Sequence, residues 1–231
     1  MKQHCLMFKT GNYFIDCFSG VCLFLPLLPA IILFIKKGYE NEPMNFLMIL
    51  CFTGFLKNIL LIIPGIGDGS AITIENIFML LELIFILLIF RVLFTRNSNY
   101  VLTIFSVIFF SSLITYYIIN GISQQRVFFN LTQNGIIILV SAYALISILQ
   151  SENLMVLQTS LFWASAGTIF YFSIALLVGI LDPPVKGKSF SQQTDSLLIL
   201  NIAHIARFLL YFVASVFCRK NAKKEKEIPE V

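Results

Sequence analysis

Polar and ionisable side chains interrupt the last apolar stretch of the sequence, residues 195–218, close to its middle. Asn201 and His204 are three residues apart and share one face of a helix, and Arg207 follows within a turn. An ionisable side chain at bilayer depth costs at least about 2.5–3.5 kcal/mol, so it faces a protein interior, a partner charge or a wet cavity. The chemistry available to these groups is the binding of a polar ligand or, through a histidine with an ordinary pKa of about 6.5, proton exchange.

Two other apolar stretches carry matching groups. Glu75 and Glu82 lie in the third stretch, seven residues apart and on one helical face, and Lys57 and Asn58 lie near the end of the second. Lys57 and Arg207 supply two cations for the two carboxylates. These charges can therefore neutralise one another inside a helical bundle.

The expected depths of these charged residues in the membrane are similar, which would let them meet. At a rise of about 1.5 Å per residue, Lys57 lies roughly 10 Å below the outer end of its span, His204 roughly 13 Å, Glu82 roughly 15 Å and Arg207 roughly 18 Å. Asp16 in the first span is a possible fifth charged member. The sequence therefore predicts a polar layer at one depth.

Two interpretations of this layer remain open. In the first, it lines an outward-opening pocket between the second, third and seventh helices, where a ligand or proton alters the pairing. In the second, it is an electrostatic staple that holds the bundle and binds nothing. The candidate ligand-binding or proton-responsive residues are Glu82, Arg207, His204, Lys57, Asn201, Glu75, Tyr171 and Asn58.

The elements that must position these residues are membrane helices. The chain is 58% hydrophobic and only 12% charged, a composition too apolar for a soluble domain of 231 residues. We expect an all-α polytopic bundle of about seven helices (12–218) between an N-terminal extension (1–11) and a basic cytoplasmic tail (219–231). The expected spans are 12–35, 43–63, 71–94, 100–119, 127–149, 157–181 and 195–218.

Local signals predict two features of these helices. Pro26 and Pro29 are expected to kink the first span, because proline removes a backbone hydrogen bond. Small residues at helical spacing in the sixth span predict close helix packing. They are Ser160, Ala164, Gly167 and Thr168.

The distribution of lysine and arginine predicts the orientation. Of 16 such residues, nine fall on the side that holds the C-terminal tail, five fall on the opposite side, and Lys57 and Arg207 lie within spans. The positive-inside rule then places the N-terminus outside and the C-terminus in the cytoplasm.

Short motifs in the third and sixth spans, N-I-F-x-L-x-E and F-W-x-S, resemble those of small seven-helix integral membrane proteins of Bacteroidetes-type bacteria. The matching residues are Asn76, Ile77, Phe78, Leu80, Glu82, Phe162, Trp163 and Ser165. The resemblance implies a location in a bacterial inner membrane. The layout is also similar to membrane modules that work beside sensor histidine kinases.

The expected function is that of a receptor- or sensor-type membrane module that signals to a cytoplasmic or membrane partner. No catalytic set, metal site, cofactor motif or nucleic-acid motif is evident, so an enzyme is the less favoured reading. Two alternatives remain: an intramembrane lipid-modifying enzyme with Glu82 or His204 as general base, and a small proton-linked transporter. Membrane lipids are the expected surroundings, and the sequence does not indicate an oligomeric state.

Overall fold

The computed structural model describes residues 20–63, 68–94, 127–150, 156–181 and 190–218, together with positions 109, 111, 112, 115, 116 and 119. Every regular element in this part of the chain is helical. The longer helices are α2 (Leu27–Ile35), α3 (Glu42–Ile62), α4 (Asp68–Phe90), α6 (Val127–Gln150), α7 (Ser160–Leu181) and α8 (Phe190–Phe217), and single 3₁₀ turns occupy Gly38–Glu40, Arg91–Leu93 and Val156–Gln158.

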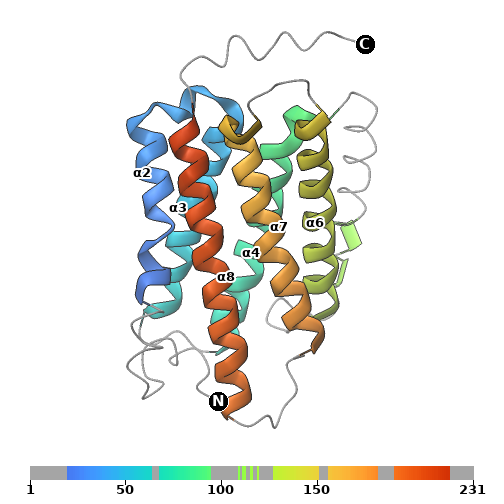
Figure 1. Cartoon of the computed structure of the whole chain (residues 1–231). Helices are drawn as coiled ribbons and strands as arrows, with labels where there is room; N and C mark the ends of the chain where they lie inside the picture. The colour runs from blue at the N-terminus through green and yellow to red at the C-terminus, as the bar shows by residue number, and fades with distance from the viewer. Residues whose placement is uncertain are drawn as a thin grey trace.

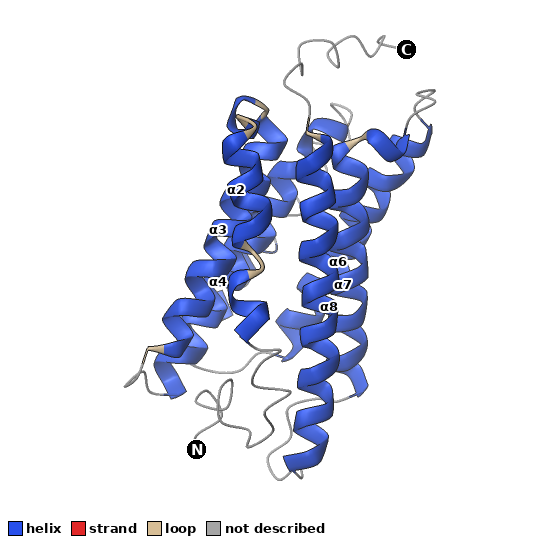
Figure 2. Ribbon diagram, turned by 60° about the vertical axis from the view of Figure 1, so that its left-hand side comes forward, coloured by secondary structure: helices blue, strands red, loops and turns tan. Residues whose placement is uncertain are grey.

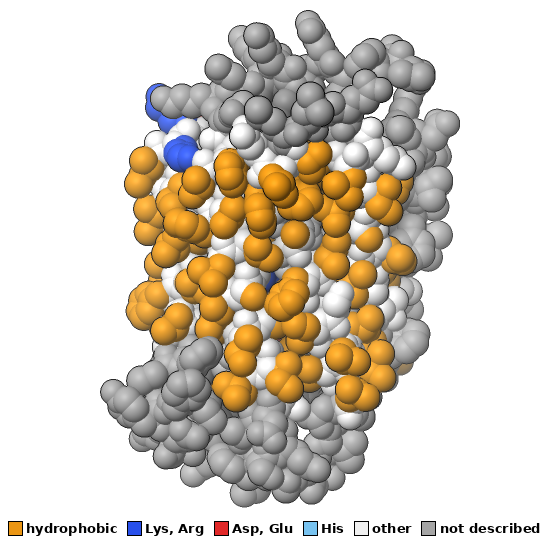
Figure 3. All heavy atoms as spheres, in the orientation of Figure 1, with side chains coloured by type: hydrophobic (Ala, Val, Ile, Leu, Met, Phe, Trp, Pro, Cys, Tyr) orange, Lys and Arg blue, Asp and Glu red, His pale blue; other side chains and the backbone are white. Residues whose placement is uncertain are grey.

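Five of these helices are long and apolar enough to cross a membrane, and a sixth, Gly20–Ile35, is apolar but shorter. Hydrophobic side chains cover the face seen in Figure 3 between the two ends of the bundle. The chain is thus a multi-pass membrane protein built as a helical bundle, as expected. Five helices begin and end within a few residues of predicted spans, and the first predicted span ends at Ile35 as expected, while its first residues, 12–19, lie outside the described part of the chain.

Three parts of the prediction fall outside the described residues. They are the extension 1–11, the tail 219–231, and the fourth span, 100–119, apart from six helical positions within it. Asp16 also lies outside them. The count of seven spans and the orientation therefore stay predictions.

The helices form two groups of three (Figures 1 and 2). In the first group α3 packs against α2 and α4, and in the second group α7 packs against α6 and α8. The groups meet where α2 contacts α8 and where α4 contacts α6, and the α4–α6 contact is the sparser of the two. The space between the groups is where the polar layer lies.

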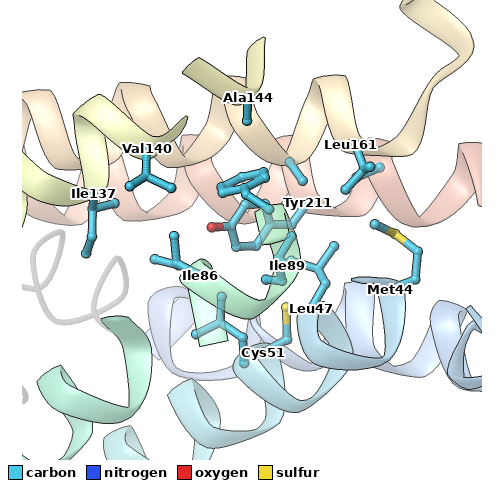
Figure 4. Packing of buried hydrophobic residues seen from close by; sticks show 14 of the residues in the cluster. Met44, Leu47, Cys51, Ile86, Ile89, Ile137, Val140, Ala144, Leu161 and Tyr211 are labelled. Carbon is cyan, nitrogen blue, oxygen red and sulfur yellow. The ribbon is translucent and has the colours of Figure 1, made fainter. Parts of the chain in front are cut away.

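One half of the bundle is filled by apolar side chains, and we call it the packed half. It is the half in which α3 and α7 begin and α4, α6 and α8 end. Figure 4 shows side chains from five helices converging there, with Tyr211 among them. The labelled members of this core are Met44, Leu47, Cys51, Ile86, Ile89, Ile137, Val140, Ala144, Leu161 and Tyr211.

Close approach of α7 and α8 depends on the predicted small residues. A Cβ at Gly167 would lie 3.0 Å from Leu210 Cβ and 3.2 Å from the Arg207 carbonyl oxygen. The side chains of Ala164 and Thr168 are buried beside it. The packing predicted for this stripe is confirmed, and the close approach places Thr168 against α8.

The predicted break in the first helix is present at Pro26, where the helix is interrupted before α2 begins. Proline has no N–H to donate to the carbonyl four residues earlier, which is that of Cys22. Asn58 Nδ2 of α3 donates to this carbonyl oxygen instead, at 3.4 Å. The Cys22 thiol in turn contacts the Asn201 carbonyl oxygen of α8 at 3.6 Å. Polar groups released by the break therefore join the first helix to α3 and α8.

Candidate functional site

The centre of the site is an ion pair that connects the two helix groups. Arg207 of α8 donates from Nη1 to Glu82 Oε1 of α4, at 2.6 Å. Arg207 is only 1% exposed, whereas Glu82 is 24% exposed. The buried guanidinium therefore relies on a carboxylate whose other side is open to its surroundings. This pairing of opposite charges was predicted from their depth and is confirmed.

A directed chain of hydrogen bonds holds the inner side of Arg207. Its Nε donates to the Tyr211 hydroxyl oxygen at 3.0 Å, and the Thr168 hydroxyl donates to the Ala164 carbonyl oxygen at 2.7 Å. The Tyr211 and Thr168 hydroxyl oxygens lie 2.8 Å apart. Because Thr168 uses its hydrogen on Ala164, Tyr211 must be the donor between them. The charge on α8 is thus linked to the backbone of α7.

Aromatic rings complete the surroundings of the guanidinium. Its Cζ lies 4.9 Å from the ring centre of Tyr171, 5.1 Å from Phe172, 5.5 Å from Phe208 and 5.0 Å from Tyr211. Each such contact stabilises a desolvated cation through the negative face of the ring. Arg207 is therefore fixed in place on several sides, and Glu82 is its only ionic partner among the described residues.

A pocket of about 400 Å³ opens beside Glu82, in the half of the bundle opposite the packed half. Its volume falls in the range that small-molecule sites occupy. Exposed Glu75 and Asn130 belong to its wall, so the pocket reaches the outside of the bundle. Its polar lining residues come from α3, α4, α6 and α7 and are Lys57, Glu75, Asn76, Glu82, Asn130, Gln133, Asn134 and Tyr171.

A smaller pocket of about 130 Å³ adjoins it. The two pockets share Lys57, Glu75, Tyr171 and Leu200 in their walls. His204 lines the smaller pocket, and its ring packs edge-on against Tyr171 and Phe208, with centroids 5.7 and 4.7 Å apart. The imidazole is therefore confined by rings beside a space that holds a few water-sized molecules.

All the predicted site residues except Arg207 line one of the two pockets. Glu82 lines the larger pocket, Lys57, Glu75 and Tyr171 line both, and Asn58, Asn201 and His204 line the smaller one. The predicted pocket between the second, third and seventh helices corresponds most closely to the smaller one, which also takes part of its wall from the first and sixth helices. The larger pocket lies further toward the fifth and sixth helices, α6 and α7.

Lys57 differs from Arg207 in having no ionic partner among the residues that the structure describes. No salt bridge or hydrogen bond joins its ammonium group to any residue in the described ranges. Of the two cations that were predicted to be available for pairing, Arg207 is paired with Glu82, and Lys57 has no ionic partner among the described residues. A half-buried lysine without a partner, in the wall of a pocket, is available to a ligand.

The sequence interpretation missed the contribution of α6. Asn130, Gln133 and Asn134 lie on one helical face and line the larger pocket. Gln133 is 1% exposed, and its Nε2 donates to the Met79 carbonyl oxygen of α4 at 2.8 Å. Its Oε1 is buried without a partner. The spacing of these three amides along the helix was the available signal.

Tyr211 was also missed, because a tyrosine in an apolar helix is an ordinary packing residue. The signal was its position four residues after Arg207, one helical turn away.

Within the described ranges, no group of three or more histidine, cysteine, aspartate or glutamate residues could hold a metal ion.

Comparison with known proteins gives no match to a protein family, to a curated protein or to a solved structure. The function is therefore argued from the geometry of the pockets and the ion pair.

Proposed function

We propose that the protein is a receptor- or sensor-type membrane module whose larger pocket binds a small polar ligand. One observation carries the proposal: Glu82 is at once a wall of the pocket and the ionic partner of Arg207. A ligand that contacts Glu82 therefore acts on a bond that joins the two helix groups. Binding and helix packing are coupled through one carboxylate.

The coupling follows from competition for that carboxylate. Glu82 Oε1 accepts the bond from Arg207, and no described residue donates to Oε2. A donor group on a ligand would share the negative charge and weaken the bond to Arg207. The hydrogen bonds from Arg207 through Tyr211 and Thr168 would transmit the shift to α7. A ligand that favours one arrangement of the groups shifts their equilibrium by its difference in affinity.

The chemistry of the lining favours binding over covalent catalysis. Among the described residues that line the larger pocket, none is a serine, threonine or cysteine. Glu82 is engaged by Arg207, and His204 lies in the smaller pocket between two rings. An intramembrane enzyme with Glu82 or His204 as base is therefore the weaker alternative.

A transporter is the second candidate, and the position of the pocket favours it. The larger pocket is lined by both helix groups and opens in one half of the bundle, while the other half is packed. Movement of one group against the other would open the opposite side. A receptor keeps that side closed, so flux distinguishes the two functions.

The cellular setting belongs to the same proposal. In a bacterial inner membrane with the C-terminus in the cytoplasm, the pocket would open outward and the packed half would face inward. Lys36 and Lys37 lie at the end of the packed half, which agrees with the positive-inside rule. A cytoplasmic or membrane partner would bind the helix ends there and respond to a change in their packing.

The test measures whether pocket occupancy changes the packed half. Spin labels at Val92 and Leu157, exposed positions in the first and second groups, are placed after the native cysteines are replaced. A panel of polar metabolites and lipid headgroups is added in proteoliposomes. We expect at least one compound to bind and change the distance between the labels, and to do so without being transported or consumed.

Blocked and control variants decide the outcome. Ala175→Phe fills the larger pocket, and Leu177→Phe adds the same ring at an exposed position of the same helix. The response should vanish in the first variant and persist in the second. If a compound accumulates inside the vesicles, the protein is a transporter and not a receptor. If binding persists in Ala175→Phe, the ligand does not bind in the larger pocket.

A further inference from the structure

Among the described residues, four charged side chains in and beside the wall of the larger pocket have charges that add up to zero. Lys57 and Arg207 are positive, and Glu75 and Glu82 are negative. A ligand with a net charge would place an uncompensated charge beside the ion pair of buried Arg207 and Glu82, which is costly. A ligand that carries one positive and one negative group would leave the sum unchanged.

The pocket offers a separate partner for each of those groups. Lys57 lies on α3 without an ionic partner among the described residues, so it suits an anionic group. Glu82 lies on α4 with Oε2 free of described donors, so it suits a cationic donor. Because both line one pocket of about 400 Å³, a small molecule can reach both.

Gln133 specifies the cationic group further. A carbonyl oxygen can only accept, so the Gln133 amide must turn Nε2 toward Met79 and leave Oε1 as the unpaired atom. A buried acceptor without a donor is rare in proteins, and it marks a place where a donor belongs. Gln133 lines the pocket, so a small movement of its buried side chain would let a ligand with N–H groups supply that donor.

The aromatic residues argue against a quaternary ammonium group. Such groups are recognised by free aromatic faces. The rings of Tyr171 and Phe172, which line the pocket, are already engaged by Arg207 at 4.9 and 5.1 Å. Hydrogen bonds from a primary ammonium group to carboxylate and amide oxygens fit the lining better.

We propose that the larger pocket binds a zwitterion with a primary ammonium group, held by Glu82 and Gln133 Oε1, and an anionic group, held by Lys57. This assignment rests on the proposed function and names its ligand class. The same chemistry occurs in an ethanolamine phospholipid headgroup and in soluble amino acids. The anionic group is then a phosphodiester in the first source and a carboxylate in the second.

The probes for the test differ in one group at a time. The full chain is placed in nanodiscs of phosphatidylcholine, and the affinities of glycerophosphoethanolamine, glycerophosphocholine and glycerophosphoglycerol are measured by calorimetry. They share a phosphodiester and differ in carrying a primary ammonium, a quaternary ammonium and no cation. We expect the first to bind about tenfold more tightly than the other two.

The two sources are separated by further arms. Replacing part of the phosphatidylcholine by phosphatidylethanolamine should compete with the soluble probe if the lipid headgroup enters the pocket. Competition by γ-aminobutyrate, and none by the lipid, would assign a soluble carboxylate zwitterion. Either result supports the ligand class.

Variants tie the binding to the named residues. Lys57→Met should weaken binding of the ethanolamine probe about tenfold, and Gln133→Leu should reduce its preference over the choline probe. Leu139→Ala, at an exposed position of α6, is the control and should change neither.

Tighter binding of the anionic or choline probe would overturn the ligand class but leave the pocket intact. Failure of all probes, γ-aminobutyrate and the headgroup lipid would overturn the ligand class. The spin-label response to the wider panel, and its loss in Ala175→Phe, then decides the proposed function separately.

Discussion

The packed half of the bundle and the half that holds the pockets are built from the same helices but are filled in different ways. In the packed half, Leu47, Ile86 and Ala144 meet from α3, α4 and α6 with almost no exposed surface. About one to three turns away, the same three helices carry Lys57, Glu82 and Gln133 in the wall of the larger pocket. The ion pair between Glu82 and Arg207 lies at the boundary between the two halves.

This difference separates residues that hold the fold from residues that are free to bind. Apolar packing in one half supplies stability, so the other half can leave a pocket of about 400 Å³ unfilled. Arg207 belongs to the fold, because it is buried and has partners on several sides. Lys57 belongs to the pocket, because it has no ionic partner among the described residues.

The largest expected loss of unfolding free energy comes from removing the ion pair at the boundary between the two halves. Glu82→Gln strands the buried Arg207 guanidinium, and leaving a buried charge unpaired costs about 3–5 kcal/mol of unfolding free energy. Glu75→Gln is the matched control at an exposed position and should cost less than about 1 kcal/mol. Reversible unfolding in mixed micelles measures both. If the two variants lost the same unfolding free energy, the ion pair of Glu82 and Arg207 would contribute no more to stability than exposed Glu75 does.

A smaller effect tests the packing of the two halves directly. Leu47→Ala in the packed half removes a fully buried side chain and should cost about 3 kcal/mol. Ile72→Ala on α4 widens a pocket that is already open and should cost less than about 1 kcal/mol. Unfolding midpoints in the same micelles report the difference. If Ile72→Ala were as costly as Leu47→Ala, the pocket would be as tightly packed as the core.

Two glycines give the smallest effects, with opposite signs. Gly167→Ala places a Cβ 3.0 Å from Leu210 Cβ and should destabilise the bundle by about 1–3 kcal/mol through overpacking. Gly135→Ala meets no atom within 4 Å and should raise the unfolding free energy by up to about 1 kcal/mol through helix propensity. Thermal unfolding of the two variants gives the signs. A gain from Gly167→Ala would mean that α7 and α8 are not in close contact.

Much of this division could be predicted from the sequence, because charges inside apolar helices are few and conspicuous. Their depth along the helices predicted the meeting of Glu82 and Arg207, and the small residues around Gly167 predicted the approach of α7 to α8. The break at Pro26 was also predicted from the missing N–H group.

Other features depend on how distant helices face one another, which local patterns do not determine. An uncharged amide such as that of Gln133 carries little signal in one helix, since its role depends on the carbonyl of Met79 across the α4–α6 contact. That Lys57 has no ionic partner among the described residues is likewise a property of the assembled bundle. The sequence alone suggested that it would pair.

The most direct test of the division is the behaviour of Lys57→Met in one preparation, with unfolding free energy and affinity for glycerophosphoethanolamine measured side by side. We predict that the unfolding free energy stays the same or rises, because a half-buried cation without an ionic partner among the described residues is removed, while the affinity falls about tenfold. A loss of several kcal/mol in stability with unchanged affinity would instead make Lys57 part of a staple that holds the helices together.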